Sequence, residues 1–86
     1  MAKILIVDDD ILITGLMQTL VNMDGHEAII VNDSNEALET AISAQPNLIT
    51  LDLMMPGLSG YELCEQLRAN PQFNQTPIII ISAKED

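Results

Sequence analysis

The chain has 86 residues, with three basic and 13 acidic side chains and a formal net charge of −10 at neutral pH. A chain of this length is expected to form one domain, residues 1–86, with a core near the lower limit for unaided folding. This acidic balance excludes nucleic-acid and anionic-membrane binding surfaces, because phosphate groups and acidic lipids would find no basic patch to bind. It favours a cation or a basic protein surface as the ligand.

Two features of the sequence indicate a cytoplasmic protein: a single cysteine, and an apolar run near the N-terminus that is too short for a signal peptide. Cys64 is the single cysteine of the sequence, which excludes an intramolecular disulfide and favours a reducing compartment. Only four apolar residues separate Lys3 from Asp8, too few for a signal peptide or a membrane span. We therefore expect no membrane contact.

Four short apolar runs alternate with three amphipathic segments along the chain. The runs are rich in β-branched residues, which is typical of buried strands, and the amphipathic segments have helical spacing. The predicted strands span residues 4–7, 27–31, 48–52 and 78–81, and the predicted helices span about 11–23, 34–44 and 60–69.

Capping signals support these helices. Asp10 and Ser59 stand where an N-cap side chain is expected, and Asp33 with Glu36 resembles a capping box. In the first helix, leucines recur at every fourth position and form a wide apolar stripe. We expect His26 to be exposed, and Tyr61 and Phe73 to be packing residues.

The element order βαβαβαβ predicts the α/β class, an open parallel sheet with right-handed crossovers and helices on both faces. All strands of such a sheet end at one edge, where these folds place their chemistry. Asp8, Asp9, Asp52 and Ser82 each lie at or just after a strand end. We therefore expect these four side chains to converge.

Carboxylates that converge need a counter-charge. Two of them about 5 Å apart repel each other by roughly 3 kcal/mol at an effective dielectric constant near 20. A hard divalent cation removes this repulsion, and carboxylate and carbonyl oxygens with several waters are the ligands typical of Mg²⁺. Asp8, Asp9 and Asp52 are the predicted carboxylate ligands, and the backbone carbonyl of Met54 is a candidate fourth.

Three segments together resemble the receiver domain of two-component response regulators. They are the first strand with its three aspartates (residues 4–10), the third strand with the loop that follows (residues 51–60), and the end of the fourth strand (residues 80–83). The resemblance covers essentially the whole chain. It implies a flavodoxin/CheY-like sheet in the order 2-1-3-4, without the last helix-strand-helix of the family.

The resemblance implies a role for each site residue. Asp52 matches the phosphoacceptor, which takes a phosphoryl group from a histidine kinase or a phosphotransfer protein. Asp9 matches a direct Mg²⁺ ligand, and Asp8 an acidic partner that binds the ion largely through water. Met54 matches a carbonyl ligand and Ser82 the switch hydroxyl. Such a domain is a signalling module and not an enzyme in the ordinary sense.

The chain also departs from the family pattern. Receiver domains continue with a fifth strand that ends in a lysine, whereas this sequence stops at Asp86. We expect metal binding and the nucleophile to be intact, and phosphoryl-dependent switching to be impaired. A four-isoleucine edge strand favours association, so we expect a homodimer formed through the fourth strand or the exposed face of the first helix.

Two other functions are compatible with parts of the sequence. Asp8 and Asp10 after a strand resemble the nucleophile and acid of haloacid-dehalogenase-type aspartyl phosphatases, but that hypothesis leaves the loop after Asp52 unexplained. The chain could also be a non-signalling, oligomerising fragment. Labelling of Asp8 instead of Asp52 would favour the first alternative, and absence of Mg²⁺ binding would favour the second.

Overall fold

A computed structural model describes residues 1–81. The elements in chain order are β1 (Lys3–Val7), α1 (Ile11–Met23), β2 (Glu27–Val31), a 3₁₀ turn (Ser34–Glu36), α2 (Ala37–Ala44), β3 (Leu48–Asp52), α3 (Gly60–Ala69), a second 3₁₀ turn (Pro71–Phe73) and β4 (Ile78–Ile81). The predicted element order and fold class are confirmed. Only β1, which begins one residue early, and the second helix differ from the predicted ranges.

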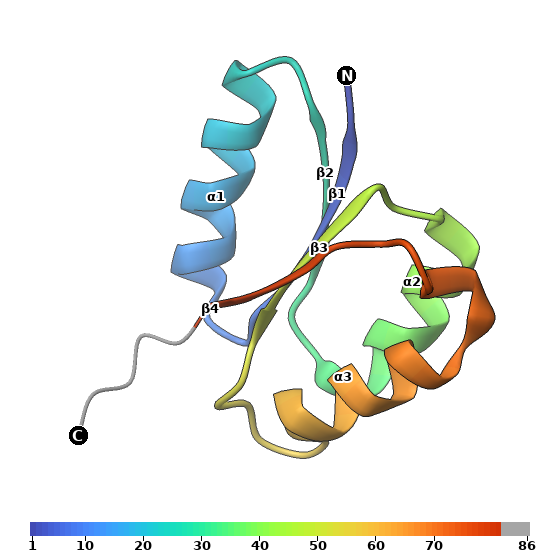
Figure 1. The fold of residues 1–86 in the computed structure, drawn as a ribbon. Coiled ribbons are helices and arrows are strands. Elements are labelled where there is room, and N and C mark those ends of the chain that lie inside the picture. The colour runs from blue at the N-terminus through green and yellow to red at the C-terminus, as the bar shows by residue number, and fades with distance from the viewer. Residues whose placement is uncertain (82–86) are drawn as a thin grey trace.

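The four strands form one parallel sheet in the order β2-β1-β3-β4, as predicted. Helix α1 lies on one face of the sheet, and α2 and α3 lie on the other (Figure 1). All four strands therefore end at the same edge, where the loops that follow β1 and β3 begin.

The main core lies between the sheet and the α2–α3 layer. Alternate residues of the two central strands point into it, because successive side chains of a strand face opposite sides of a sheet. Buried aliphatic side chains and one aromatic ring fill this layer, and they include Leu5, Val7, Ile49, Leu51, Leu63, Leu67 and Phe73. The predicted packing role of Phe73 is confirmed.

Side-chain caps fix where α1 and α3 begin. Asp10 is the N-cap of α1, and its Oδ1 accepts from the backbone N–H groups of Leu12 and Ile13. Ser59 and Glu62 form a reciprocal capping box at the start of α3. Both caps satisfy backbone donors that have no partner within the helix.

No helix in residues 1–81 has the length and apolarity needed to cross a bilayer.

The start of the second helix was predicted wrongly. Residues 34–36 form a 3₁₀ turn, and the α-helix begins at Ala37. Asp33 caps this turn by accepting from the N–H of Asn35, two residues on, instead of pairing with Glu36 as a capping box would. The predicted packing role of Tyr61 was also wrong, because its side chain is exposed.

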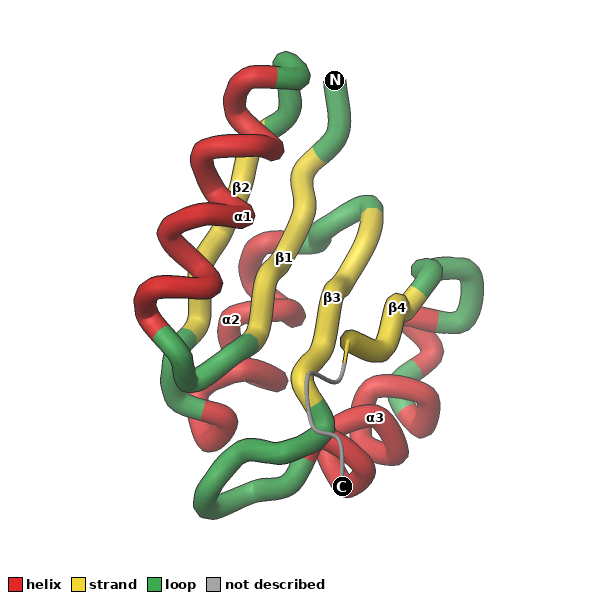
Figure 2. Tube along the Cα trace, turned by 90° about the vertical axis from the view of Figure 1, so that its left-hand side faces the viewer, coloured by secondary structure: helices red, strands yellow, loops and turns green. Residues whose placement is uncertain are grey.

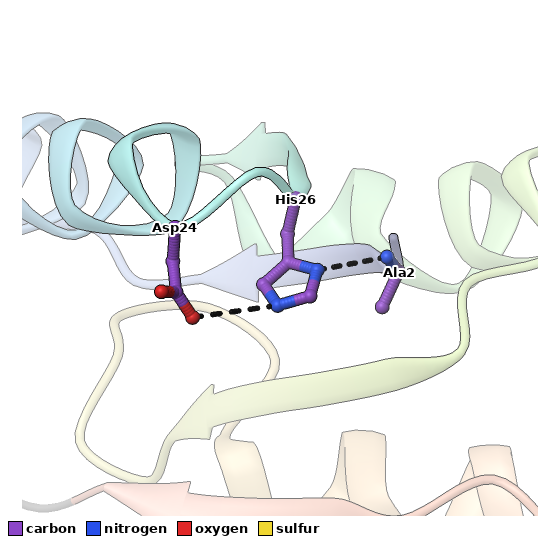
Figure 3. Close-up of polar contacts among 3 residues, drawn as sticks. All are labelled: Ala2, Asp24 and His26. Atoms are coloured by element: carbon purple, nitrogen blue, oxygen red, sulfur yellow. Dashed lines mark hydrogen bonds and ion pairs between the residues drawn. The ribbon is translucent and has the colours of Figure 1, made fainter.

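His26 is not the exposed residue that the sequence predicted. Its side chain is 32% exposed, its Nδ1 accepts from the backbone N–H of Ala2 at 2.9 Å, and its Nε2 lies 3.5 Å from Asp24 Oδ2. Figure 3 shows the imidazole between these two residues. The ring thus connects the end of α1 to the start of β1, a contact that sequence spacing does not reveal.

Candidate functional site

The register of the two central strands places two carboxylates side by side. Val7 of β1 pairs with Leu51 of β3, so Asp8 and Asp52 are the next residues in register. Both lie on the opposite face from Val7 and Leu51, which point into the main core. The predicted convergence of the first and third strand ends is therefore built into the sheet.

The structure brings together three of the predicted site residues. One carboxylate oxygen from each of Asp8, Asp9 and Asp52 lies within 4.8 Å of the others. Asp8 is only 9% exposed, whereas Asp9 is exposed and Asp52 is half-buried. We call these three residues the acidic cluster. Asp10 has a structural role instead, as the N-cap of α1.

Backbone hydrogen bonds orient two of the three carboxylates. Asp8 Oδ1 accepts from the N–H of Asp10 at 2.9 Å, and Asp52 Oδ1 accepts from the N–H of Met54 at 3.1 Å. Each bond spans two residues and is formed by the turn that directly follows a strand. The turns after β1 and β3 therefore hold these two side chains at the edge of the sheet.

A polar pair behind Asp8 fixes the backbone of the acidic cluster, and sequence reasoning missed it. Asn32 Nδ2 donates to the Asp8 carbonyl oxygen at 2.8 Å and to Thr14 Oγ1 at 3.0 Å. Thr14 is buried on the inner face of α1. The position of Asn32 directly after a strand, at the same edge as the aspartates, was the signal that could have revealed it.

Gly60 lies directly against the backbone of Asp52. A Cβ atom at this position would be 2.5 Å from Leu53 Cα and would also collide with the Asp52 carbonyl oxygen. The Gly60 N–H donates to the Leu53 carbonyl at 3.2 Å. The first residue of α3 thus sets the position of the end of β3, which carries Asp52.

The electrostatics of the acidic cluster favour a bound cation. Burial raises the pKa of Asp8 above its ordinary value, a hydrogen bond from the Asp10 backbone opposes this, and the charges of Asp52, Asp9 and Asp10 raise it further. Of the described basic side chains, Lys3 donates to the Ala44 carbonyl and Arg68 to the carbonyls of Phe73 and Thr76.

Both sets of contacts lie at the edge of the sheet opposite the acidic cluster, because Lys3 begins β1, and Phe73 and Thr76 precede the start of β4. Three clustered carboxylates with hard oxygen donors fit Mg²⁺ or a similar divalent ion. Neutralising the cluster would also offset the repulsion among its members.

We expect Asp8→Asn to stabilise the protein when divalent cations are absent. Because the folded-state pKa of Asp8 lies above its ordinary value of 3.8, ionised Asp8 opposes folding. This penalty is complete above the folded-state pKa and vanishes below the unfolded-state value. The free energy of unfolding should rise by on the order of 1 kcal/mol at pH 7, and the gain should shrink as the pH falls toward 4.

Urea denaturation at pH 7 and pH 4 measures this effect. Asp33→Asn is the matched control, because Asp33 is an exposed cap outside the acidic cluster and asparagine caps about equally well. A lower free energy of unfolding for Asp8→Asn at pH 7 would contradict the expectation.

Met54 and Ser82 are the two predicted site residues that do not belong to the acidic cluster. Met54 lies in the loop just after β3, is 57% exposed and donates its N–H to Asp52, so the ligand role of its carbonyl stays a prediction. Ser82 lies outside the described residues, and its role as switch hydroxyl likewise stays a prediction.

Comparison with known proteins shows the family. The sequence model of one protein family, described as the response regulator receiver domain, matches residues 4–86. The chain belongs to the response regulator receiver domain family. As in other receiver domains, the module serves signalling, and the flavodoxin/CheY-like fold predicted from sequence is confirmed.

Three relatives show how similar this chain is to known response regulators. It is 42% identical over 84 residues to the alkaline phosphatase synthesis transcriptional regulatory protein PhoP of Bacillus subtilis, covering 98% of this chain and 34% of PhoP. It matches the chemotaxis response regulator CheY4 of Vibrio cholerae with a TM-score of 0.93 and 32% identity, over 100% of this chain and 72% of that one.

The third relative is the response regulator TrrA of Thermotoga maritima, solved in complex with Mg²⁺-BeF. Its TM-score is 0.87 at 31% identity, over 99% of this chain and 72% of that one. The chain spans about a third of the length of PhoP and of a probable transcriptional regulator of Cyanophora paradoxa, which it matches at the same identity.

Proposed function

We propose that this receiver domain accepts a phosphoryl group on Asp52 from a histidine kinase or a phosphotransfer protein, with Mg²⁺ as cofactor. The observation that carries the proposal is the acidic cluster, three carboxylates within 4.8 Å of one another at the carboxyl edge of a parallel sheet. Family membership supports it, and so does the Mg²⁺-BeF complex of TrrA.

The chemistry is a phosphoryl transfer to a carboxylate. An oxygen of Asp52 attacks the phosphorus of a phosphohistidine, and the phosphorus–nitrogen bond breaks as an acyl phosphate forms. The bond's electron pair stays on the imidazole nitrogen, which takes up a proton from solvent. When bound, Mg²⁺ would supply the positive charge that offsets the phosphoryl oxygens and the carboxylates.

The residues around Asp52 would orient the attacking oxygen, bind the metal ion and contact the phosphoryl group. The Met54 N–H holds Asp52 Oδ1, which leaves Oδ2 as the oxygen we assign to attack. We assign Asp9 and Asp52 as direct metal ligands, Asp8 as a partner through water, and the Met54 carbonyl as a further ligand. The Ser82 hydroxyl would donate to the new phosphoryl oxygens and bias the conformation of the domain.

We infer the kind of partner surface and the cellular compartment of this reaction from the net charge and the cysteine content. A net charge of −10 suits a basic docking face on the phosphodonor protein and does not suit nucleic acid as a ligand of these residues. The single, free Cys64 suits the cytoplasm, where thiols stay reduced.

Mass spectrometry after incubation with acetyl phosphate tests the proposal. With Mg²⁺ we expect the intact chain to gain the mass of one phosphoryl group, and with EDTA in place of Mg²⁺ we expect no gain. Borohydride reduction followed by peptide mapping should place the label on Asp52. A label on Asp8 would instead support the phosphatase alternative, and no label in either buffer would support a non-signalling module.

A further inference from the structure

Asp9 differs from the other two members of the acidic cluster in how its carboxylate is held. Asp8 and Asp52 each accept from a backbone N–H, whereas within residues 1–81 no hydrogen bond reaches the exposed carboxylate of Asp9. It nevertheless lies within 4.8 Å of the other two. The position of this carboxylate therefore depends on the backbone that carries it, which is the peptide between Asp8 and Asp9.

The end of β2 holds the backbone of Asp8 on both sides. The Asp8 N–H donates to the Val31 carbonyl oxygen at 3.1 Å, and the Asp8 carbonyl oxygen accepts from Asn32 Nδ2 at 2.8 Å. Because a peptide unit is planar, fixing this carbonyl also fixes the N–H and the Cα of the next residue. Asn32 thus determines the direction in which Asp9 leaves the strand.

Thr14 in turn holds the side chain of Asn32. Its hydroxyl donates to the Ile11 carbonyl oxygen at 3.3 Å and accepts from Asn32 Nδ2 at 3.0 Å. The amide of Asn32 cannot be turned around, because the Asp8 carbonyl can only accept. Thr14 is 2% exposed, and losing a partner costs a buried polar group more than an exposed one. The buried hydroxyl therefore favours the one orientation of Asn32 that reaches Asp8.

These contacts join three elements close to the acidic cluster. We call the hydrogen bonds of Asn32 to Thr14 and to the Asp8 carbonyl the Asn32 bridge. Figure 2 shows α1 in front of β2, with the first turn of the helix beside the ends of β1 and β2. All partners of the Asn32 bridge lie between residues 8 and 32, so its geometry is set by contacts inside this part of the chain.

We propose that Asn32 and Thr14 are positioning residues for the Mg²⁺ ligand Asp9. The Asn32 bridge holds the Asp8–Asp9 peptide so that the Asp9 carboxylate stays beside that of Asp52 before the ion arrives. A ligand held in place loses less conformational freedom on binding. Partners that orient metal ligands typically contribute about tenfold to 100-fold in affinity. This inference rests on the Mg²⁺ binding that is part of the proposed function.

Two substitutions of Thr14 separate the hydrogen bond from packing. Thr14→Val keeps the volume of the side chain and removes the hydroxyl, whereas Thr14→Ser keeps the hydroxyl and removes the methyl group. Isothermal titration of the 86-residue chain with MgCl₂ measures the dissociation constant. We expect a value about tenfold higher for Thr14→Val and a value close to that of wild type for Thr14→Ser. If only packing mattered, Thr14→Ser would be the weaker binder.

Asn32→Leu breaks the Asn32 bridge from its other end. It should weaken Mg²⁺ binding at least as much as Thr14→Val, and adding Thr14→Val to it should cause no further loss, because both substitutions act on one network. Asn35→Leu is the matched control, since Asn35 is exposed in the 3₁₀ turn that follows, and it should bind like wild type. No substitution here changes the net charge, so the long-range attraction for the cation is unchanged.

A measurement on wild type tests the same inference without any variant. A contact that favours Mg²⁺ binding must be favoured by Mg²⁺ to the same extent. Hydrogen exchange of the Asn32 side-chain amide, followed by NMR, should therefore slow by up to about tenfold when Mg²⁺ is saturating. Urea denaturation without Mg²⁺ shows whether each variant folds, and it should rank the variants differently from the dissociation constants.

Three results would overturn the proposal: a wild type that binds no Mg²⁺, a Thr14→Val variant that binds it as tightly as wild type, or equal weakening by Thr14→Ser and Thr14→Val. Unchanged exchange of the Asn32 amide on adding Mg²⁺ would also overturn it. All these measurements are made without a phosphodonor. A wild type that binds Mg²⁺ but takes up no phosphoryl group would thus contradict the proposed function alone.

Discussion

Asp52→Asn is expected to lower the yield of acyl phosphate from acetyl phosphate and Mg²⁺ by at least about 100-fold. The amide has nearly the shape of the carboxylate, and its oxygen can still accept from the Met54 N–H, but it is a poor nucleophile at phosphorus. Intact-mass spectrometry of both proteins under identical conditions measures the difference. An undiminished mass gain in the variant would remove Asp52 from the role of phosphoacceptor.

The stability of the same variant separates a chemical role from a folding defect. Without divalent cations, Asp52→Asn should unfold at the same or a higher urea concentration than wild type, because the repulsion between Asp52 and the buried Asp8 is gone. With Mg²⁺, wild type should gain about 2.7 kcal/mol at an ion concentration 100 times its dissociation constant. The variant should gain clearly less.

Asp33→Asn is again the matched control, since it removes one negative charge outside the acidic cluster. It should keep both the phosphoryl uptake and the Mg²⁺-dependent stabilisation of wild type. An equal loss in this control would mean that net charge, and not the acidic cluster, is responsible.

The strands and their order could be predicted because the pattern and the topology that determine them are visible in the sequence. A β-branched run such as residues 78–81 fits a pleated strand better than a helix, and βαβ connections leave few arrangements open. The meeting of Asp8 with Asp52 follows from the same rule, since the ends of neighbouring parallel strands share one edge.

What escaped prediction depends on contacts between distant segments. His26 is held by Ala2, which is 24 residues earlier in the chain, and Asn32 is held by Asp8 and Thr14. Helical periodicity could place Tyr61 near the apolar face of α3 but could not show that α2 and the sheet leave it uncovered. Spacing along the chain carries no information about such contacts.

The role of Gly60 escaped prediction in the same way and leads to the largest stability effect we expect. Gly60→Ala should lower the free energy of unfolding by about 3 kcal/mol. The added Cβ would meet Leu53 Cα at 2.5 Å, and because this atom belongs to the backbone, no side-chain rotation can relieve the clash. For a domain whose total stability is on the order of 5–15 kcal/mol, this is a large share.

Gly15→Ala is the matched control, since a Cβ at this position in α1 would meet nothing within 4 Å. Alanine in an exposed helix interior should stabilise the protein by roughly 0.5–1 kcal/mol, so urea denaturation should show changes of opposite sign in the free energy of unfolding for the two glycine substitutions.

Relief of the clash at position 60 must move the end of β3, which carries Asp52. The Gly60→Ala molecules that remain folded should therefore also bind Mg²⁺ more weakly and take up less phosphate. Wild-type stability and phosphoryl uptake in Gly60→Ala would show that the contact with Asp52 does not position the carboxylate.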